Sequence, residues 1–550
     1  PAAKAAAART ASDAHPCPAP TPRTIVYRRV LSLLPALAVV ALVVAITALA
    51  RRLPIPTPIL QVTAGAIVGL IPGISIPQLD PHLIIFIFLP PILWAAAFFT
   101  SLREFRSNLR QISLLAVGLV LATTLIVAFV ARLLLPDLPW AVAVALGAIV
   151  SPPDAVAATA IVSRLPVPRR VIVILEGESL VNDASALVLY RTAVAAAVTG
   201  VFSWGESVVR FFIDAGVGIG IGLAIGWVII WVLARTKDSL AEALVTLAGP
   251  YLAWIVAESL HVSAVLACVA GGLHLRQHFS TVIAPLSRIQ GRAIWDLFIF
   301  LLNALIFLLL GAQFAELLDA VPPESLGRVA MTGVWIAGVT IVVRWIWVPV
   351  ATWLPRWTSA EVRRREPAPE WKPVALVSWT AMRGIVSLAT ALALPRVLGD
   401  GSPFPYRSEI IVITMVVIVM TLVVQGFTLE PIIRWMRFAP EHAHDAEERL
   451  ARRELARRAA ETLEDLSREP GVDRADVDWL RAELRERHRE QEAASGTSEG
   501  RRTLRLAMIA AQRRMLVRLR NEDAIGDEVL MAIERELDLD AIRSGAGEER

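Results

Sequence analysis

Up to about residue 435, apolar residues fall in blocks that are each roughly 20 residues long. A helix of about 20 residues crosses the hydrocarbon core of a bilayer, and its backbone groups must be hydrogen-bonded within the segment. The pattern therefore predicts an all-α polytopic membrane protein with about 13 transmembrane helices in a transmembrane domain at 30–435. The predicted spans are 30–50, 57–74, 82–100, 112–134, 139–163, 171–199, 208–234, 239–257, 260–275, 293–318, 329–354, 373–396 and 407–434.

The two ends of the chain follow other patterns. Residues 1–29 are rich in Ala and Pro and are predicted to be a disordered extension. The block at 30–50 is long for a signal-peptide core, and Arg51 and Arg52 follow it instead of a small-residue cleavage site, so it is predicted to be the first membrane helix. From 436 to 550, Arg and Glu alternate with Leu and Ala, which predicts a charged helical cytoplasmic region. A passive tail and a regulatory domain fit this pattern equally well.

The composition agrees with a membrane protein and excludes other classes. Hydrophobic residues make up 55% of the chain. The basic residues are almost all arginine, with lysine only at Lys4, Lys237 and Lys372, which favours a GC-rich bacterial genome. Cys17 and Cys268 are too few for a disulfide framework or a zinc site. No nucleic-acid partner is predicted, because the basic residues lie mostly in membrane loops or among acids of the tail.

Loop charge predicts the orientation, because cytoplasmic loops carry an excess of Lys and Arg. If the C-terminal region is cytoplasmic, the inside loops hold Arg51, Arg52, Arg103, Arg106, Arg110, Arg164, Arg169, Arg170, Arg235, Lys237, Arg276, Arg288, Arg292, Arg356, Arg363, Arg364, Arg365 and Lys372. The outside holds only Arg132, Arg210, Arg328, Arg396 and Arg407. This bias favours thirteen spans with the N-terminus outside, although Arg23, Arg28 and Arg29 argue against it.

The span at 139–163 contains Ser151-Pro152-Pro153-Asp154 in its middle. Two prolines remove two backbone donors and clash with the preceding turn, so the helix is predicted to break there and free carbonyl groups beside Asp154. Broken helices at membrane depth are tolerated where they line a cavity or an ion site. The alternative is a simple kink in which Asp154 caps the second half of the helix.

The span at 171–199 carries the run Glu176-Gly177-Glu178-Ser179-Leu180-Val181-Asn182-Asp183. Ser179 and Asp183 are four residues apart and share a helix face, so a hydroxyl and a carboxylate can converge on one ion. Glu178 and Asn182 form a second such pair on the adjacent stripe. Apolar residues on both sides of the run exclude a loop. Glu176 is interpreted as an interfacial acid.

The span at 373–396 contains Thr380-Ala381-Met382-Arg383-Gly384. Because a buried arginine needs an acidic partner, Glu178 and Arg383 are predicted to form a structural ion pair. Gly384 would interrupt the helix or let a neighbour approach. In the alternative, Arg383 extends to the membrane interface. If thirteen spans divide as six, one linker and six, the two interrupted spans occupy equivalent places, which indicates a transporter's midplane site.

These residues support a mechanism in which a cation and protons compete for Asp183, with Asp154 and Ser179 beside it. A hard monovalent cation such as Na+ prefers oxygen ligands, and these side chains and the freed carbonyls supply them. A carboxylate held away from water favours its protonated form, and a second acid nearby strengthens that preference. One shared site with alternating access would give an antiporter that needs no cofactor.

The motifs resemble those of the sodium/proton exchanger family, the monovalent cation:proton antiporter-1 family, over roughly residues 30–435. The resemblance is carried by Ala148-Ile149-Val150-Ser151-Pro152-Pro153-Asp154-Ala155-Val156-Ala157, by Glu176 to Asp183 and by Met382-Arg383-Gly384. Phe88-Leu89-Pro90-Pro91-Ile92 and Phe300-Leu301-Leu302-Asn303 also resemble its third and tenth spans.

The resemblance implies two inverted six-helix repeats with interrupted helices crossing near the midplane, a homodimer, and elevator-like movement of a core domain. It also implies ion and proton binding at Asp183, with Asp154 and Ser179 close by, and a pair between Glu178 and Arg383. Asn182 is predicted to belong to the same ion-binding site. Asn182 before Asp183 is typical of electroneutral members. The implied role is Na+/H+ exchange and pH homeostasis in a bacterial cell membrane.

Two departures from the family pattern bear on the choice of cation. Ala155 follows Asp154 where many members have proline, and Ala95 stands where many have a glutamate. The missing acid removes one possible ligand and leaves Li+ or K+ transport open.

Two other classes of function compete with the antiporter. A passive cation channel would line a pore with the same acids, but broken helices and a buried Arg383 fit alternating access better. An enzyme is disfavoured, because the one Gly-x-Ser-x-Gly match, at Gly496 to Gly500, lacks the strand–turn–helix context of a nucleophile elbow.

Overall fold

The computed structural model describes residues 34–438 and 442–494 with short gaps, and only scattered residues between 507 and 540. The gaps fall at 51, 54, 72–80, 163–164, 201–203, 237, 284, 315–320, 366–369, 399–400 and 469–472. The predicted disordered extension at 1–29, Arg51, and the match at Gly496 to Gly500 lie outside the described residues.

The described residues form an all-α fold, as predicted, and each predicted span overlaps one helix or consecutive helical segments. They are α3 (Leu34–Ala50), α4 (Thr57–Gly69), α5 (Pro81–Phe99), α7 (Leu109–Ser113) with η1 (Leu114–Leu119) and α8 (Val120–Leu134), α9 (Trp140–Val150) with α10 (Ala155–Val162), α11 (Arg169–Thr199), α12 (Trp204–Leu233), α13 (Ser239–Ser259), α14 (Ala264–Val282), α15 (Pro285–Ala312), α17 (Pro323–Thr358), α19 (Trp371–Trp379) with α20 (Ile385–Leu392), and α21 (Arg407–Met436). Short α6 (Leu102–Ser107) and α18 (Ala360–Arg365) lie between spans. In the described residues the only β-type pairing is an isolated bridge between Val397 and Pro403.

Seven of the described helical segments are long and apolar enough on their own to cross a membrane. Three more apolar helical segments, at Ala38–Ala50, Thr57–Gly69 and Trp140–Val150, are shorter. The interrupted spans miss the length criterion because each is split into two short helices. Multiple crossing of a membrane is therefore established, while the count of thirteen remains a prediction.

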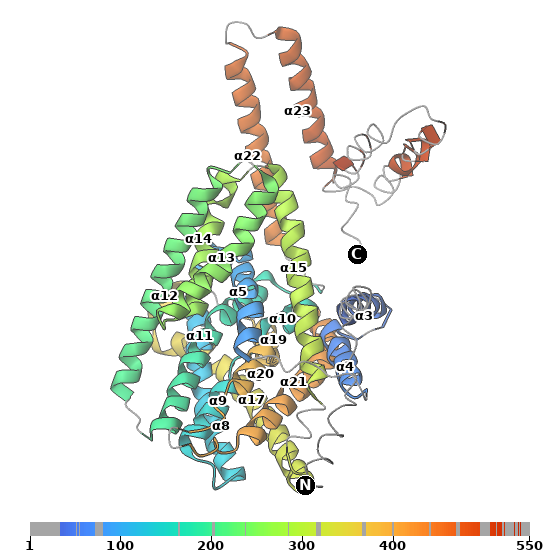
Figure 1. Cartoon of the computed structure of the whole chain (residues 1–550). Helices are drawn as coiled ribbons and strands as arrows, with labels where there is room; N and C mark the ends of the chain where they lie inside the picture. The colour runs from blue at the N-terminus through green and yellow to red at the C-terminus, as the bar shows by residue number, and fades with distance from the viewer. Residues whose placement is uncertain are drawn as a thin grey trace, which may run out of the picture. The chain divides into compact units, whose positions relative to one another are not determined.

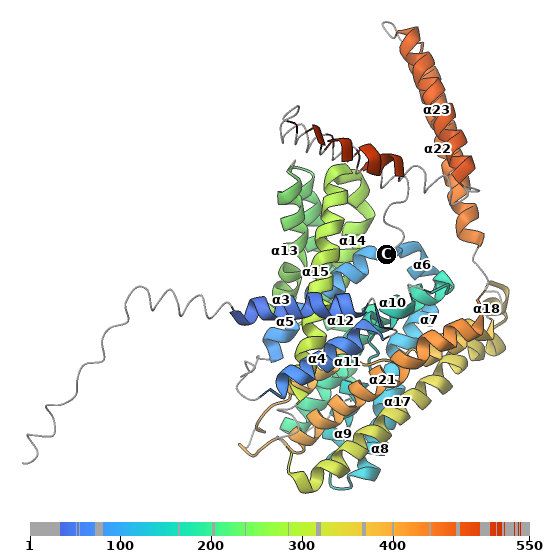
Figure 2. The same ribbon diagram turned by 90° about the vertical axis from the view of Figure 1, so that its right-hand side faces the viewer.

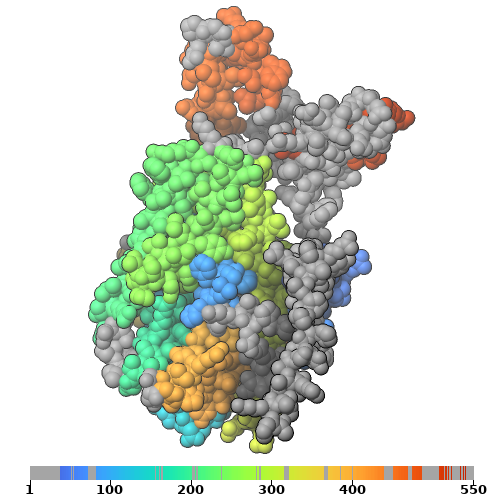
Figure 3. Space-filling model, in the orientation of Figure 1, coloured from blue at the N-terminus to red at the C-terminus, as the bar shows by residue number. Residues whose placement is uncertain are grey.

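The membrane helices form two groups that pack mainly within themselves. In one group α12 packs along α14, α14 along α5, and α15 along α4 and α13. In the other, α8 packs along α9, α9 along α11, and α17 along α21. In Figures 1 and 2, the green α13 and α14 of the first group lie toward the top of the view, and the cyan α8 and α9 of the second lie at the bottom. In the space-filling view, a blue surface of α5 lies between the green and the orange regions (Figure 3).

Small residues permit the closest contacts in the first group. A Cβ atom at Gly311 on α15 would lie 1.9 Å from the carbonyl oxygen of Val62 on α4. Only glycine allows the two backbones to approach this closely, as is common where helices pack in lipid. This contact fixes α15, which lines one wall of the site described below.

The charged C-terminal region is a separate compact unit, Glu441–Arg550. Its helices α22 (His442–Leu466) and α23 (Arg474–Ala494) lie side by side in Figure 1. Arg481 on α23 forms an ion pair with Glu464 on α22, with 3.1 Å between Nη2 and Oε2. The helical content of this region agrees with its Arg and Glu pattern.

Candidate ion-binding site

Two membrane spans are broken in their middle, where the sequence predicted it. The first break, Ser151–Asp154, separates α9 from α10, and the second, Thr380–Gly384, separates α19 from α20. At the first break the two prolines provide no backbone donor to continue the helix. Each break leaves carbonyl groups without helical partners inside the protein.

The two breaks contact each other directly. The backbone N–H of Asp154 donates to the carbonyl oxygen of Met382 at 2.7 Å. The Nε of Arg383 donates to the carbonyl oxygen of Val150 at 2.6 Å, and its Nη1 donates to the carbonyl oxygen of Ala381. Arg383 thus binds freed carbonyl groups of both broken spans. Its side chain is only 2% exposed, which excludes the alternative in which it extends to an interface.

The structure shows the capping role of Asp154 that the sequence offered as an alternative, and it also places the residue on the cavity described below. Its Oδ1 accepts from the backbone N–H of Val156 at 2.8 Å, which caps α10. Its Oδ2 lies against Gly384, where an added Cβ would be 1.9 Å away. Glycine is therefore required at 384 if the carboxylate is to occupy this place.

A cavity of about 360 Å³ lies beside the crossing breaks. Three residues predicted to bind the ion, Asp154, Ser179 and Asp183, line it together with Pro152, Pro153 and Gly384. Its other polar lining residues are Thr159, Glu176, Asp296, Asn303 and Ser387. The walls come from α5 and α15 on one side and from α10, α11 and α20 on the other, so the cavity lies between the two helix groups.

Asp183 is one of the lining residues of this cavity. Its residue is 8% exposed, and it also lines a second, much smaller space of about 20 Å³ beside Phe88 and Thr390. Among the described residues, no Lys or Arg forms an ion pair with Asp183. An unpaired buried carboxylate is costly, so this group needs either a proton or a bound cation.

The predicted ion pair between Glu178 and Arg383 is wrong. Both carboxylate oxygens of Glu178 accept instead from Arg344 on α17, at 2.5 and 2.7 Å. Arg344 also donates to the carbonyl oxygen of Val377 at 2.9 Å. Glu178 does have a basic partner, but an arginine on another helix provides it. The expectation that a buried arginine needs an acid also fails for Arg383, whose guanidinium binds freed carbonyl groups instead.

Asn182 is placed differently from the other predicted ligands. Its side-chain amide donates to the carbonyl oxygen of Pro153 at 2.9 Å, and the residue is fully buried. It does not line the ion cavity. In this geometry Asn182 positions the Pro-Pro break beside Asp183.

Several cavity residues were not identified from the sequence. Ser387 is 1% exposed, and its hydroxyl has no hydrogen-bond partner within the part of the chain that is described. Ser387 follows Gly384 by less than one helical turn, and this short spacing from the predicted break could have identified it from the sequence. Asp296 and Asn303 lie within the predicted span at 293–318, but their place on the cavity wall depends on how α15 packs.

The described residues contain no cluster of three or more His, Cys, Asp or Glu side chains suited to a resident metal. The cavity is instead lined by four carboxylates, those of Asp154, Glu176, Asp183 and Asp296, and by hydroxyl groups, and it lies beside the carbonyl groups of the breaks. Oxygen ligands of this kind suit a hard cation. The same carboxylates can take up protons, so the arrangement can bind either ion.

A family model described as sodium/hydrogen exchanger, transmembrane, matches residues 38–435. An uncharacterised Na+/H+ exchanger of Mycobacterium tuberculosis is 35% identical over 518 residues, covering 92% of this chain and 95% of the relative. A sodium, potassium, lithium and rubidium/H+ antiporter of Bacillus pumilus is 31% identical over 507 residues, covering 90% of this chain and 75% of the relative.

The fold is also similar to that of a solved structure. The sodium proton antiporter MjNhaP1 from Methanocaldococcus jannaschii superimposes with a TM-score of 0.58 at 20% sequence identity. The match covers 72% of this chain and 96% of that protein. At this identity the similarity concerns the fold alone.

Proposed function

The chain belongs to the sodium/hydrogen exchanger family, and from this premise we propose that it exchanges Na+ for H+ across a bacterial cell membrane. The observation that carries the proposal is the cavity in which Asp154, Ser179 and Asp183 meet at two broken helices. The other buried acid on α11, Glu178, is held by Arg344 and is not available to an ion.

In the proposed mechanism, Asp183 holds either a proton or the cation. When Na+ enters the cavity, it replaces the proton, and the hydroxyl groups of Ser179 and Ser387 complete its oxygen shell. The negative charge of the Asp154 carboxylate further stabilises the bound cation. Because each cation displaces a proton, the apparent affinity for Na+ rises with pH, by about tenfold per unit while the carboxyl group is protonated.

Alternating access would result from movement between the two helix groups, because the cavity lies between them. The group containing α9, α10, α11, α19 and α20 carries the acids and both breaks. A shift of this group against α5 and α15 would expose Asp183 first to one side and then to the other. We propose electroneutral exchange, a homodimer with its C-terminal region in the cytoplasm, and a role in pH homeostasis.

A second candidate cation is K+. The Bacillus pumilus relative is named for sodium, potassium, lithium and rubidium. Ala95 lines the cavity at the position where the family resemblance leads us to expect a glutamate, so fewer charges face the ion here. A less charged site discriminates less strongly in favour of the smaller ion.

The experiment is cation-induced proton release from proteoliposomes, followed with a pH-sensitive dye for Na+, Li+ and K+. The proposal expects dye recovery on addition of Na+ at several pH values, and the ion series ranks the cations. A cation current without proton movement would identify a passive channel. Silence with all three cations would overturn the proposed exchange.

A further inference from the structure

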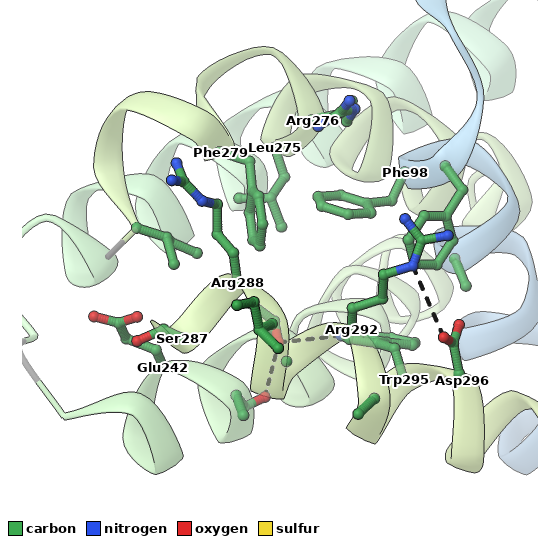
Figure 4. A pocket seen from close by; sticks show the side chains of 18 of the residues that line it. Phe98, Glu242, Leu275, Arg276, Phe279, Ser287, Arg288, Arg292, Trp295 and Asp296 are labelled. Carbon is green, nitrogen blue, oxygen red and sulfur yellow. Dashed lines mark hydrogen bonds and ion pairs between the residues drawn. The ribbon is translucent and has the colours of Figure 1, made fainter. Parts of the chain in front are cut away.

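A second and larger cavity, of about 860 Å³, lies between α5, α13, α14 and α15. We call it the basic cavity, because three arginines line it, Arg276, Arg288 and Arg292. Figure 4 shows these side chains around the opening, with Phe98 and Phe279 between them. The proposed exchange uses none of these arginines.

Aromatic rings hold two of the arginines in place. The guanidinium of Arg276 lies 5.9 Å from the centre of the Phe98 ring, and that of Arg292 lies 5.5 Å from the Phe99 ring. Arg292 also lies 3.8 Å from Asp296, an exposed pair. A guanidinium presents several donors in a planar fork that matches the oxygens of a phosphate group. The cavity therefore provides a place for a phosphate.

An acid lies in the same cavity. Glu242 on α13 is 3% exposed, and its Oε2 has no hydrogen-bond partner among the described residues. In Figure 4 its carboxylate lies next to Ser287, below Arg288. A buried carboxylate oxygen without a donor is costly, so an occupant that brings an N–H donor would be stabilised here. A simple anion does not provide one.

The position and the walls indicate a lipid. The cavity lies where α13 and α15 begin and α14 ends, so it is at one end of the helices, at the level of a headgroup layer. Its walls include Trp94, Phe279 and Trp295, which suit the first carbons of an acyl chain. Basic pockets between membrane helices on the cytoplasmic side are a known setting for lipid headgroups.

We propose that the basic cavity binds the phosphoethanolamine headgroup of a phospholipid. The arginines contact the phosphate, and Glu242 accepts from the primary ammonium group. This chemistry distinguishes the lipid from its neighbours in a membrane. Phosphatidylglycerol has no ammonium group, and the quaternary ammonium of phosphatidylcholine has no N–H to donate.

The test uses the full chain purified in detergent and native mass spectrometry of lipid adducts. The probes are phosphatidylethanolamine, its N-monomethyl and N,N-dimethyl derivatives, phosphatidylcholine, phosphatidylglycerol, free phosphoethanolamine and inorganic phosphate. For the unaltered protein we expect binding to fall with each methyl group, and phosphatidylethanolamine to bind about tenfold more tightly than phosphatidylcholine. This series needs no variant and therefore does not depend on whether one folds.

Two variants assign the contacts. Glu242→Gln should remove the preference for phosphatidylethanolamine over phosphatidylcholine while phospholipid binding itself remains. Arg288→Gln should weaken all phospholipids alike. Arg434→Gln, which alters an exposed arginine paired with Glu430 on α21, is the matched control and should leave binding unchanged.

Three results would overturn the proposal. Equal binding along the methylation series would exclude a role for the ammonium group. Tighter binding of phosphatidylglycerol would identify an anionic-lipid site instead. Competition by free phosphoethanolamine or inorganic phosphate at the same concentration as the lipid would identify a soluble ligand. None of these results depends on which cation the protein transports.

Discussion

Glu178 and Asp183 lie little more than one turn apart on α11, and both are buried acids, yet their surroundings differ completely. Both oxygens of Glu178 accept from the guanidinium of Arg344. Asp183 has no basic partner within the described chain and lies between two cavities. The first acid is satisfied by the protein, whereas the second can be satisfied only by an ion or a proton.

The difference assigns a structural role to Glu178 and the proposed transport role to Asp183, although both lie on one helix. A permanently paired acid cannot exchange its partner without disrupting the fold, while an unpaired acid at a cavity can do so at low cost. Substitutions at the two positions should therefore fail in different ways, one by loss of transport and one by loss of stability.

The largest effect is expected for Asp183→Asn. The amide keeps the shape of the side chain but can neither release a proton nor balance a cation, so exchange should fall by about 100-fold or more, to the background of empty liposomes. Thermal stability should be maintained, because the variant removes a buried charge. Asp137→Asn, at an exposed acid outside the helices, is the control and should transport normally. Substantial exchange in Asp183→Asn would remove this residue from the mechanism.

The pair between Glu178 and Arg344 should behave in the opposite way. Replacing either residue alone with Ala leaves an uncompensated buried charge and should cost about 3–5 kcal/mol of stability. The double variant should recover part of this loss, measured as the unfolding temperature in detergent. The exposed pair between Arg191 and Glu258 is the comparison, and Arg191→Ala should cost less than about 1 kcal/mol. Equal effects at the two pairs would contradict the structural role of Glu178.

A smaller effect is expected for Ser387→Ala. The serine hydroxyl faces the cavity without a partner, and as one neutral ligand it should contribute about 1 kcal/mol, so the apparent KM for Na+ should rise about fivefold. The maximal rate should change little. A fall in the maximal rate with unchanged KM would indicate that the hydroxyl takes part in the conformational change instead.

The smallest change is expected at Ala95, where a glutamate would add a carboxylate to the cavity wall. Ala95→Glu should improve the preference for Na+ over K+ by a factor of about two to five, because charge interactions favour the smaller ion. Ala95→Gln provides the same size without the charge and should not shift the preference. Flux ratios measured with both cations at one pH decide the question.

The sequence was sufficient for the fold class and for most of the site. Blocks of apolar residues located the membrane helices, and the prolines at 152 and 153 located one break. Helical spacing placed Ser179 and Asp183 on one face, and the structure brings both to the cavity with Asp154. These features depend on local geometry, which sequence spacing records.

The partners of the buried charges could not be predicted in the same way. Arg344 and Arg383 both lie inside apolar spans, and choosing between them as the partner of Glu178 requires the packing of α17 against α19. The hydrogen bonds that Arg383 donates depend on carbonyl groups that become free only once both helices break. The positions of Ser387 and Asp296 on the cavity wall also depend on tertiary packing, which the sequence alone does not show.

The most direct test of competition at Asp183 is proton release on cation binding by the purified protein. Na+ is added to weakly buffered detergent solution at a series of pH values, and released protons are counted with a dye. If cation and proton compete at Asp183, the wild type releases protons wherever the site is protonated, its apparent affinity for Na+ rises with pH, and Asp183→Asn releases none. Release that persists in the variant, or Na+ binding by the wild type without protons, would contradict it.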